Sequence, residues 1–232
     1  MPLFGPNVEE MERERNIDGL TNALKHRNNN VRRKAADALG RIGDAKAVEP
    51  LIQTLKDSDI NVVWEAMTAL AKVGEPALDP LTQLLKDKDI SLRSAAVLAL
   101  KDIRGLRAVE ALLLALRDEQ GHVRELAAFA LGEKGDARAV EPLIQTLRDE
   151  NNRVRREVVK ALGRIRDPRA LGSLNQALTD EDGDVRLGAK NALELIKTRA
   201  ISASPKVEEC PSCGVEVPAG AEFCPNCGRR IK

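Results

Sequence analysis

Four cysteines gather near the end of the chain and have the spacing of metal ligands. Cys210, Cys213, Cys224 and Cys227 follow the pattern Cys-x2-Cys-x10-Cys-x2-Cys, which gives two close pairs. Two such pairs supply the four thiolates of a tetrahedral zinc site. Because four protein ligands leave no open position for water, we expect one structural zinc ion and no catalytic role for it.

The residues around the cysteines favour two tight metal-binding turns, or knuckles. A proline follows the first cysteine of each pair, and Gly214 and Gly228 allow the positive φ that such a turn needs. Val215, Val217 and Phe223 are expected to form a small hairpin between the knuckles. A segment this short cannot bury a core, so metal binding must supply its folding free energy. Residues 210–232 resemble a zinc ribbon. Iron in a rubredoxin-like site is the alternative, although such sites carry a much longer insert between the pairs.

The rest of the chain repeats itself at a spacing of 30 or 31 residues. This period predicts a solenoid, in which each unit buries its apolar face only against its neighbours. The fold class is therefore all-α: an α-solenoid of six repeats followed by a small ribbon. Such an array has no closed cavity but presents a long curved surface. The six copies are marked by Val31, Val62, Leu92, Val123, Val154 and Val185.

Each repeat predicts two helices joined by an acidic turn. Val48, Leu51, Ile52 and Leu55 follow the spacing of one helical face, and the second helix of that repeat ends at Gly74. First helices are expected near 17–26, 46–56, 77–86, 107–117, 138–148 and 169–178. Second helices are expected near 31–41, 62–72, 92–103, 123–133, 154–164 and 185–198.

The pattern divides the chain into residues 1–199, a repeat array with a cap helix at about 7–14, a linker at 200–209 and the ribbon at 210–232. Charged residues make up 31% of the chain and the net charge is +1, so composition shows no bias toward polyanions. We find no apolar stretch long enough for a membrane span and no apolar secretory signal. We expect a cytoplasmic monomer that does not enter a membrane.

The repeats resemble HEAT repeats, and among them the short kind named after phycobilisome lyases. The resemblance covers about residues 16–198 and rests on two patterns, D-x-x-V-R-x-x-A-x-x-A-L-G and A-V-E-P-L-I-x-x-L. The second pattern stands best at Ala47–Leu55 and Ala139–Leu147. The resemblance implies that the second helices line the concave side. It is specific for the fold and says little about function.

An arginine follows the marker residue in five of the six copies, and the second copy has Val63 in its place. We interpret these arginines as a ladder of ion pairs to the acidic turns, which would be structural. The arginines are Arg32, Arg93, Arg124, Arg155 and Arg186, and the expected partners include Asp57, Asp87, Asp118 and Asp149.

One stripe of the second helices changes its chemistry from copy to copy and is the predicted partner-binding surface. The only aromatic residues of the repeats, Trp64 and Phe129, lie on it with Leu98 between them. An exposed Trp beside apolar neighbours is typical of a binding anchor, although each ring could instead pack against a neighbouring helix. Charged residues flank this apolar centre. The predicted set also contains Arg33, Arg41, Glu125, Arg156, Lys160 and Arg164.

Three classes of function remain. We favour a non-catalytic scaffold, a prokaryotic adaptor or assembly module that binds a protein partner on the concave face and uses the ribbon as a second interaction module. Among enzymes with related repeats, deoxyhypusine hydroxylases need several His-Glu pairs, whereas His26 and His122 are the only histidines here. A phycobilin-lyase-like enzyme or chaperone is a further alternative. Nucleic-acid binding, as in HEAT-like DNA glycosylases, fits Trp64 and the basic ribbon tail but not the near-zero net charge.

Overall fold

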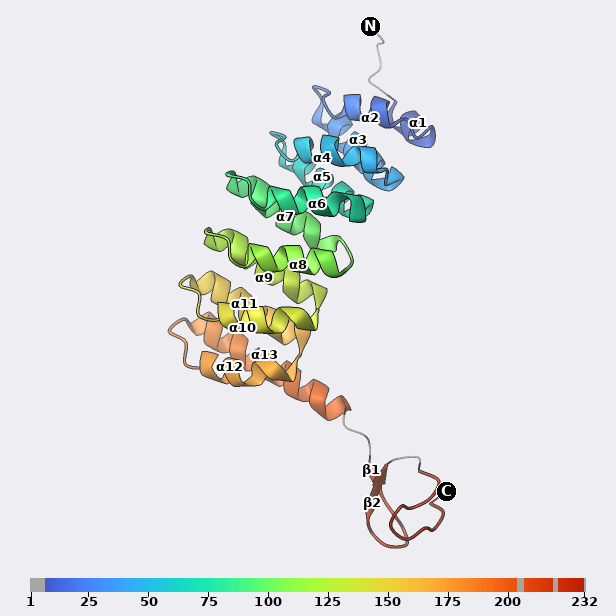
Figure 1. Ribbon diagram of the computed structural model, residues 1–232, viewed down its shortest axis with the longest axis vertical. Helices are drawn as coiled ribbons and strands as arrows, with labels where there is room; N and C mark the ends of the chain where they lie inside the picture. The colour runs from blue at the N-terminus through green and yellow to red at the C-terminus, as the bar shows by residue number, and fades with distance from the viewer. Residues whose placement is uncertain (1–6, 204–206, 219–220, 232) are drawn as a thin grey trace.

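The computed structural model describes residues 7–203, 207–218 and 221–231. Paired helices stack into an elongated array that ends in a small two-stranded unit (Figure 1). The structure confirms the all-α solenoid of six helix pairs. Helix α1 (Val8–Arg13) lies within residues 7–14, where a cap helix is predicted, and its Val8 is buried.

The six first helices are short and most are entered through a 3-10 turn. They are α2 (Ile17–Ala23), α4 (Val48–Thr54), α6 (Leu78–Leu84), α8 (Leu106–Ala115), α10 (Val140–Thr146) and α12 (Leu171–Ala177). Their 3-10 turns are η1 (Ala45–Ala47), η2 (Glu75–Ala77), η3 (Ala137–Ala139) and η4 (Pro168–Ala170). Pro50 is the third residue of α4, in the first turn, where its missing N–H costs no helical hydrogen bond.

The second helices are longer and begin about two residues before the predicted positions. They are α3 (Asn29–Ile42), α5 (Ile60–Val73), α7 (Ile90–Asp102), α9 (Gly121–Lys134), α11 (Asn152–Ile165) and α13 (Gly183–Ala203). The early start follows from capping, because the side chain of a residue such as Asp59 accepts the N–H of Asn61 and satisfies a free donor of the first turn.

Successive second helices stack directly on one another, and glycine sets how closely they approach. A Cβ added at Gly40 of α3 would lie 2.7 Å from the Cα atom of Ala69 in α5, and the pair Gly132 and Ala161 repeats this approach at 2.8 Å. The equivalent positions of α5 and α7 hold Ala71 and Lys101. The stack is correspondingly less close between α5 and α7 and between α7 and α9.

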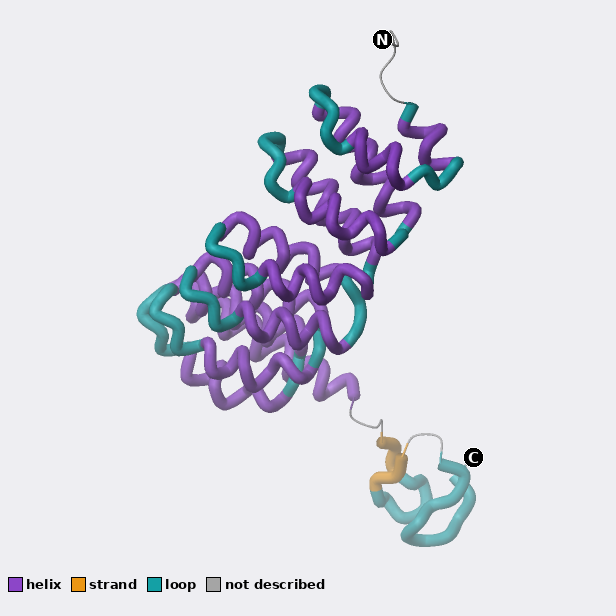
Figure 2. Tube along the Cα trace, turned by 45° about the horizontal axis from the view of Figure 1, so that its top comes forward, coloured by secondary structure: helices purple, strands orange, loops and turns teal. Residues whose placement is uncertain are grey.

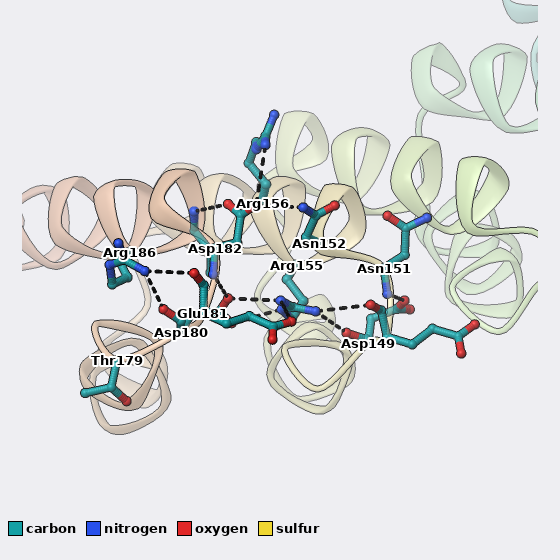
Figure 3. Close-up of polar contacts among 12 residues, drawn as sticks. Asp149, Asn151, Asn152, Arg155, Arg156, Thr179, Asp180, Glu181, Asp182 and Arg186 are labelled. Carbon is teal, nitrogen blue, oxygen red and sulfur yellow. Dashed lines mark hydrogen bonds and ion pairs between the residues drawn. The ribbon is translucent and has the colours of Figure 1, made fainter.

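The predicted arginine ladder is present and links successive repeats at four of the five junctions. The pairs lie along the edge of the array that carries the inter-helix turns (Figure 2), and Figure 3 shows one of them, Arg155 with Asp180. Each guanidinium donates two hydrogen bonds of 2.6–3.0 Å to an aspartate one repeat later, and its third nitrogen donates to carbonyl oxygens of its own turn. The hydrogen bond from Arg32 lowers the pKa of Asp57 below its usual value. The four pairs are Arg32–Asp57, Arg93–Asp118, Arg124–Asp149 and Arg155–Asp180.

One of the aspartates predicted as a partner of the ladder arginines is not part of the ladder. Asp87 accepts no guanidinium on its carboxylate within the described part of the chain, because the residue one repeat earlier is Val63. Its carboxylate accepts the backbone N–H of Asp89, and Arg93 donates to its backbone carbonyl instead. The ladder continues past the predicted set at Asp180.

The same junction lacks a further repeated feature. In three other repeats an aspartate caps the 3-10 turn, as Asp44 does for Lys46. Between repeats two and three this residue is missing, Gly74 leads directly into η2, and no side chain caps the turn. The missing residue explains why Val62 and Leu92 are 30 residues apart while the other markers are 31 apart.

Regular structure enters both ends of the segment predicted as linker. Helix α13 continues to Ala203, and Val207–Glu209 forms strand β1 of the ribbon. The remaining linker residues, 204–206, lie outside the described residues. None of the helices described here is long and apolar enough to cross a membrane.

We predict that removing one ladder arginine lowers the free energy of unfolding strongly. The Arg93 and Asp118 side chains are only 5% and 8% exposed, so Arg93→Met leaves a buried carboxylate without its partner and should cost about 3 kcal/mol. Arg186→Met is the matched control, because among the described residues Arg186 donates to the carbonyls of Asp180 and Glu181 and to no carboxylate. Urea unfolding of both variants measures the effect, and equal midpoints would contradict a structural ladder.

Candidate functional site

Each cysteine pair lies at the tip of its own short hairpin. Strand β1 pairs antiparallel with β2 (Glu216–Pro218) across the first pair, and Phe223 bridges Arg230 across the second. The single hairpin predicted between the knuckles is therefore wrong. The reason is that Gly214, at φ 71°, turns the chain back along β1 directly after Cys213. Val217 is buried against the cysteines, whereas Phe223 is 58% exposed.

The sulfur atoms are placed as a tetrahedral metal requires. All four Sγ atoms lie within 4.8 Å of one another, with 3.8 Å between Cys210 and Cys227 and 3.7 Å between Cys213 and Cys224. A tetrahedron with metal–sulfur bonds of about 2.3 Å has sulfur–sulfur edges of about 3.8 Å. The four cysteines that the sequence predicts as ligands are thus together at a separation that fits zinc.

Protonation also favours a bound cation. A backbone hydrogen bond from Val215 and one from the Asn226 side chain lower the pKa of the Cys213 thiol to about 6. For Cys227, a backbone hydrogen bond from Arg229 is outweighed by desolvation and the neighbouring thiols, which raise its pKa to about 11. Without a cation, the cluster cannot hold four thiolates at neutral pH. A divalent metal offsets the mutual repulsion of the negatively charged thiolates, so all four sulfur atoms can bind it in the deprotonated form.

The predicted partner-binding stripe lies on the stacked second helices, and its anchor is exposed. Trp64 on α5 is 60% exposed, and Ile60, one helical turn earlier on the same face, is 72% exposed. Ile90, the residue of α7 equivalent to Ile60, is 41% exposed. Ile60 and Ile90 are not in the predicted set, which follows from helices expected to begin at Val62 and Leu92. The earlier helix starts make them part of the stripe.

The two other apolar members of the predicted set, Leu98 and Phe129, are half-buried within the helix stack. Leu98 packs against the core of the array. The guanidinium of Arg164 lies over the Phe129 ring at 5.4 Å from its centroid, a cation–π arrangement. Phe129 is therefore covered in part by its own chain, whereas Trp64 is not.

The charged flanks are largely neutralised within the array. Arg41 pairs with Glu12 and Asp37, Arg156 with Asp184 at 2.7 Å, and Lys160 with Glu157 at 3.0 Å. Arg164 pairs with Glu133 and Glu157. Glu125 lies 3.7 Å from His122. Arg33 alone in the predicted set is exposed and makes no ion pair among the described residues. The flanks thus offer little free positive charge.

Comparison with known proteins agrees with these geometries. Residues 17–101 and 109–194 match HEAT repeats, residues 92–118 match the PBS lyase HEAT-like repeat, and residues 210–231 match the zinc-ribbon domain. A search of the curated proteins finds no match.

Several solved structures share the array. The complex of CpcE and CpcF of phycocyanin lyase from Nostoc sp. PCC7120 is 24% identical with a TM-score of 0.57, over 64% of this chain and 99% of that chain. A designed armadillo repeat protein in complex with the peptide (KR)4 is 22% identical with a TM-score of 0.51, over 78% and 99%. Human deoxyhypusine hydroxylase in complex with glycerol is 28% identical with a TM-score of 0.49, over 82% and 77%.

The first two likenesses show the fold alone, whereas the repeat match spans most of the chain. On that match, and on the helix pairs and arginine ladder described above, the chain belongs to the HEAT-repeat proteins and ends in a zinc-ribbon domain.

Proposed function

We propose that this chain is a non-catalytic adaptor that binds a protein partner on its second-helix face, and that this face is the concave side of the array. A helical repeat scaffold fits a protein-interaction role. The exposed Trp64 carries the proposal. Large aromatic side chains dominate binding energy at protein interfaces, and an array needs no exposed Trp for its own stability.

Two observations weigh against the alternative functions. The basic side chains of the flanks are held by carboxylates of the same array, which leaves little positive potential for phosphates. For catalysis, the metal-ligand cluster found among the described residues consists of four cysteines, and a metal held by four thiolates has no open position. We propose that its ion is a structural zinc and that the ribbon is a second interaction module.

We expect Trp64→Ala to weaken partner binding and to change the free energy of unfolding by less than about 0.5 kcal/mol, as is usual for surface positions. Leu114→Ala is the matched control, because Leu114 is a large apolar residue with 57% exposure on a first helix. Affinity capture from the source organism, with each variant's thermal unfolding measured in parallel, checks this. Undiminished recovery of the partner with Trp64→Ala would contradict the second-helix face as the binding site. An equal loss of the partner with Leu114→Ala would contradict it as well.

We expect about one zinc ion per chain, whose removal by a chelator unfolds only the ribbon. The array buries its own core without the metal, so its helical circular dichroism should remain. Metal analysis gives the stoichiometry, and the amide resonance of the buried Val217 reports on the ribbon. The Cys213→Ser/Cys224→Ser variant should match the chelated protein. A coloured iron centre, or a loss of helix on chelation, would refute this assignment.

A further inference from the structure

The junction between repeats two and three carries three exposed apolar side chains on the second-helix side of the array. We name Ile60, Trp64 and Ile90 the junction patch; their exposed fractions are 72%, 60% and 41%. The other copies hold polar residues or glycine at the positions of Ile60 and Ile90, namely Asn29, Gly121, Asn152 and Gly183. The repeat fold therefore does not require apolar side chains here.

The isoleucines replace a polar link between repeats. Asn29 donates its side-chain amide to Asp59, which caps the second helix of the next repeat, and Asn152 does the same to Asp182 at 2.6 Å (Figure 3). By this repeat equivalence, Ile60 faces Asp89, the cap of α7. Asp89 accepts the N–H of Ser91 and receives no amide from the preceding repeat among the described residues.

A second and stronger contact between the repeats, the guanidinium–aspartate pair, is missing at the neighbouring position. Four other turns hold an aspartate that accepts a bidentate guanidinium from the preceding repeat, whereas Asp87 faces Val63. Asp87 and Asp89 are thus two carboxylates without the cross-repeat donors of their counterparts. Lys88 stands between them and forms no ion pair in the described part of the chain, so this turn has a net charge of −1.

Charge therefore differs on the two sides of the junction patch. Toward repeat one lies Arg33, which makes no ion pair with any described residue and stands at the position equivalent to Trp64; toward repeat three lie Asp87 and Asp89. A partner segment that suits both the apolar patch and the carboxylates has an apolar residue against Ile60 and Trp64 and a cation on the side of repeat three. An acidic or purely apolar segment would leave the two carboxylates without a cationic partner.

We propose that the junction patch binds a protein segment whose arginine takes the place of the ladder arginine missing at Val63. Its guanidinium pairs with Asp87 as Arg32 pairs with Asp57, and its aliphatic stem and an adjacent apolar residue cover Ile60 and Trp64. Arginine suits this place better than lysine, because its planar fork donates two parallel hydrogen bonds to one carboxylate and stacks on aromatic rings. The inference rests on the proposed function and names the partner chemistry of that site.

Trp64 is the only tryptophan of the chain, so its fluorescence reports directly on the patch. The probe is an eight-residue peptide of alternating leucine and arginine, compared with the same peptide carrying glutamate or lysine instead of arginine. We expect the arginine peptide to shift Trp64 emission with saturation, the lysine peptide to bind several-fold more weakly, and the glutamate peptide not to bind. Equal binding of the arginine and glutamate peptides, or no binding of the arginine peptide, overturns the inference.

Val63→Arg is the decisive variant, because it supplies the missing ladder arginine from the chain itself. It should raise the unfolding midpoint and weaken arginine-peptide binding at least tenfold, a combination that a merely structural role of this position would not produce. Asp87→Asn should weaken binding similarly, and Lys56→Ala, on the first-helix side, should not. Tight peptide binding by a folded Val63→Arg protein refutes the inference. If the captured partner still depends on Trp64 but not on Val63 or Asp87, the inference fails while the proposed function stands.

Discussion

The buried guanidinium–aspartate pair between successive repeats is the interaction on which the array depends. A solenoid repeat contacts only its neighbours, so any feature that fixes one repeat against the next is multiplied along the chain. Arg93 shows how the pair works: it holds Asp118 one repeat ahead and the carbonyls of Asp87 and Lys88 in its own turn. One side chain thus satisfies two turns at once, which keeps turns rich in carboxylates compatible with burial.

Because the array depends on contacts between successive repeats, a junction that lacks several of them is informative. Between repeats two and three the chain lacks the ladder arginine, the asparagine link, the close glycine approach and the aspartate cap, and there it exposes Ile60 and Trp64. Each change weakens an internal contact, and together they leave apolar surface next to two carboxylates. At this junction several local rules are broken together and no ladder pair replaces the missing contacts among the described residues, as is expected where a sequence serves binding more than stability.

Much of this could be predicted from periodicity. The marker residues predicted six helix pairs, and the cysteine spacing predicted a sulfur cluster that the structure then brought together. Two features could not be predicted, because they depend on contacts between segments. The ribbon strand Val207–Glu209 has no strong pattern of its own and is defined by pairing with Glu216–Pro218. The partner of each arginine is set by the next repeat, so Asp87 resembles its counterparts in sequence yet lacks the pair.

Amide hydrogen exchange in the turns tests the central claim most directly, because exchange reports the local free energy of opening. The turn at Asp87–Asp89 and the turn at Asp118–Gln120 both lie inside the array, so end fraying does not separate them. If the ladder fixes the repeats, amides of the first turn, which lacks its guanidinium, should exchange about tenfold faster than those of the second, equal to about 1.4 kcal/mol. Equal protection of the two turns would contradict the account.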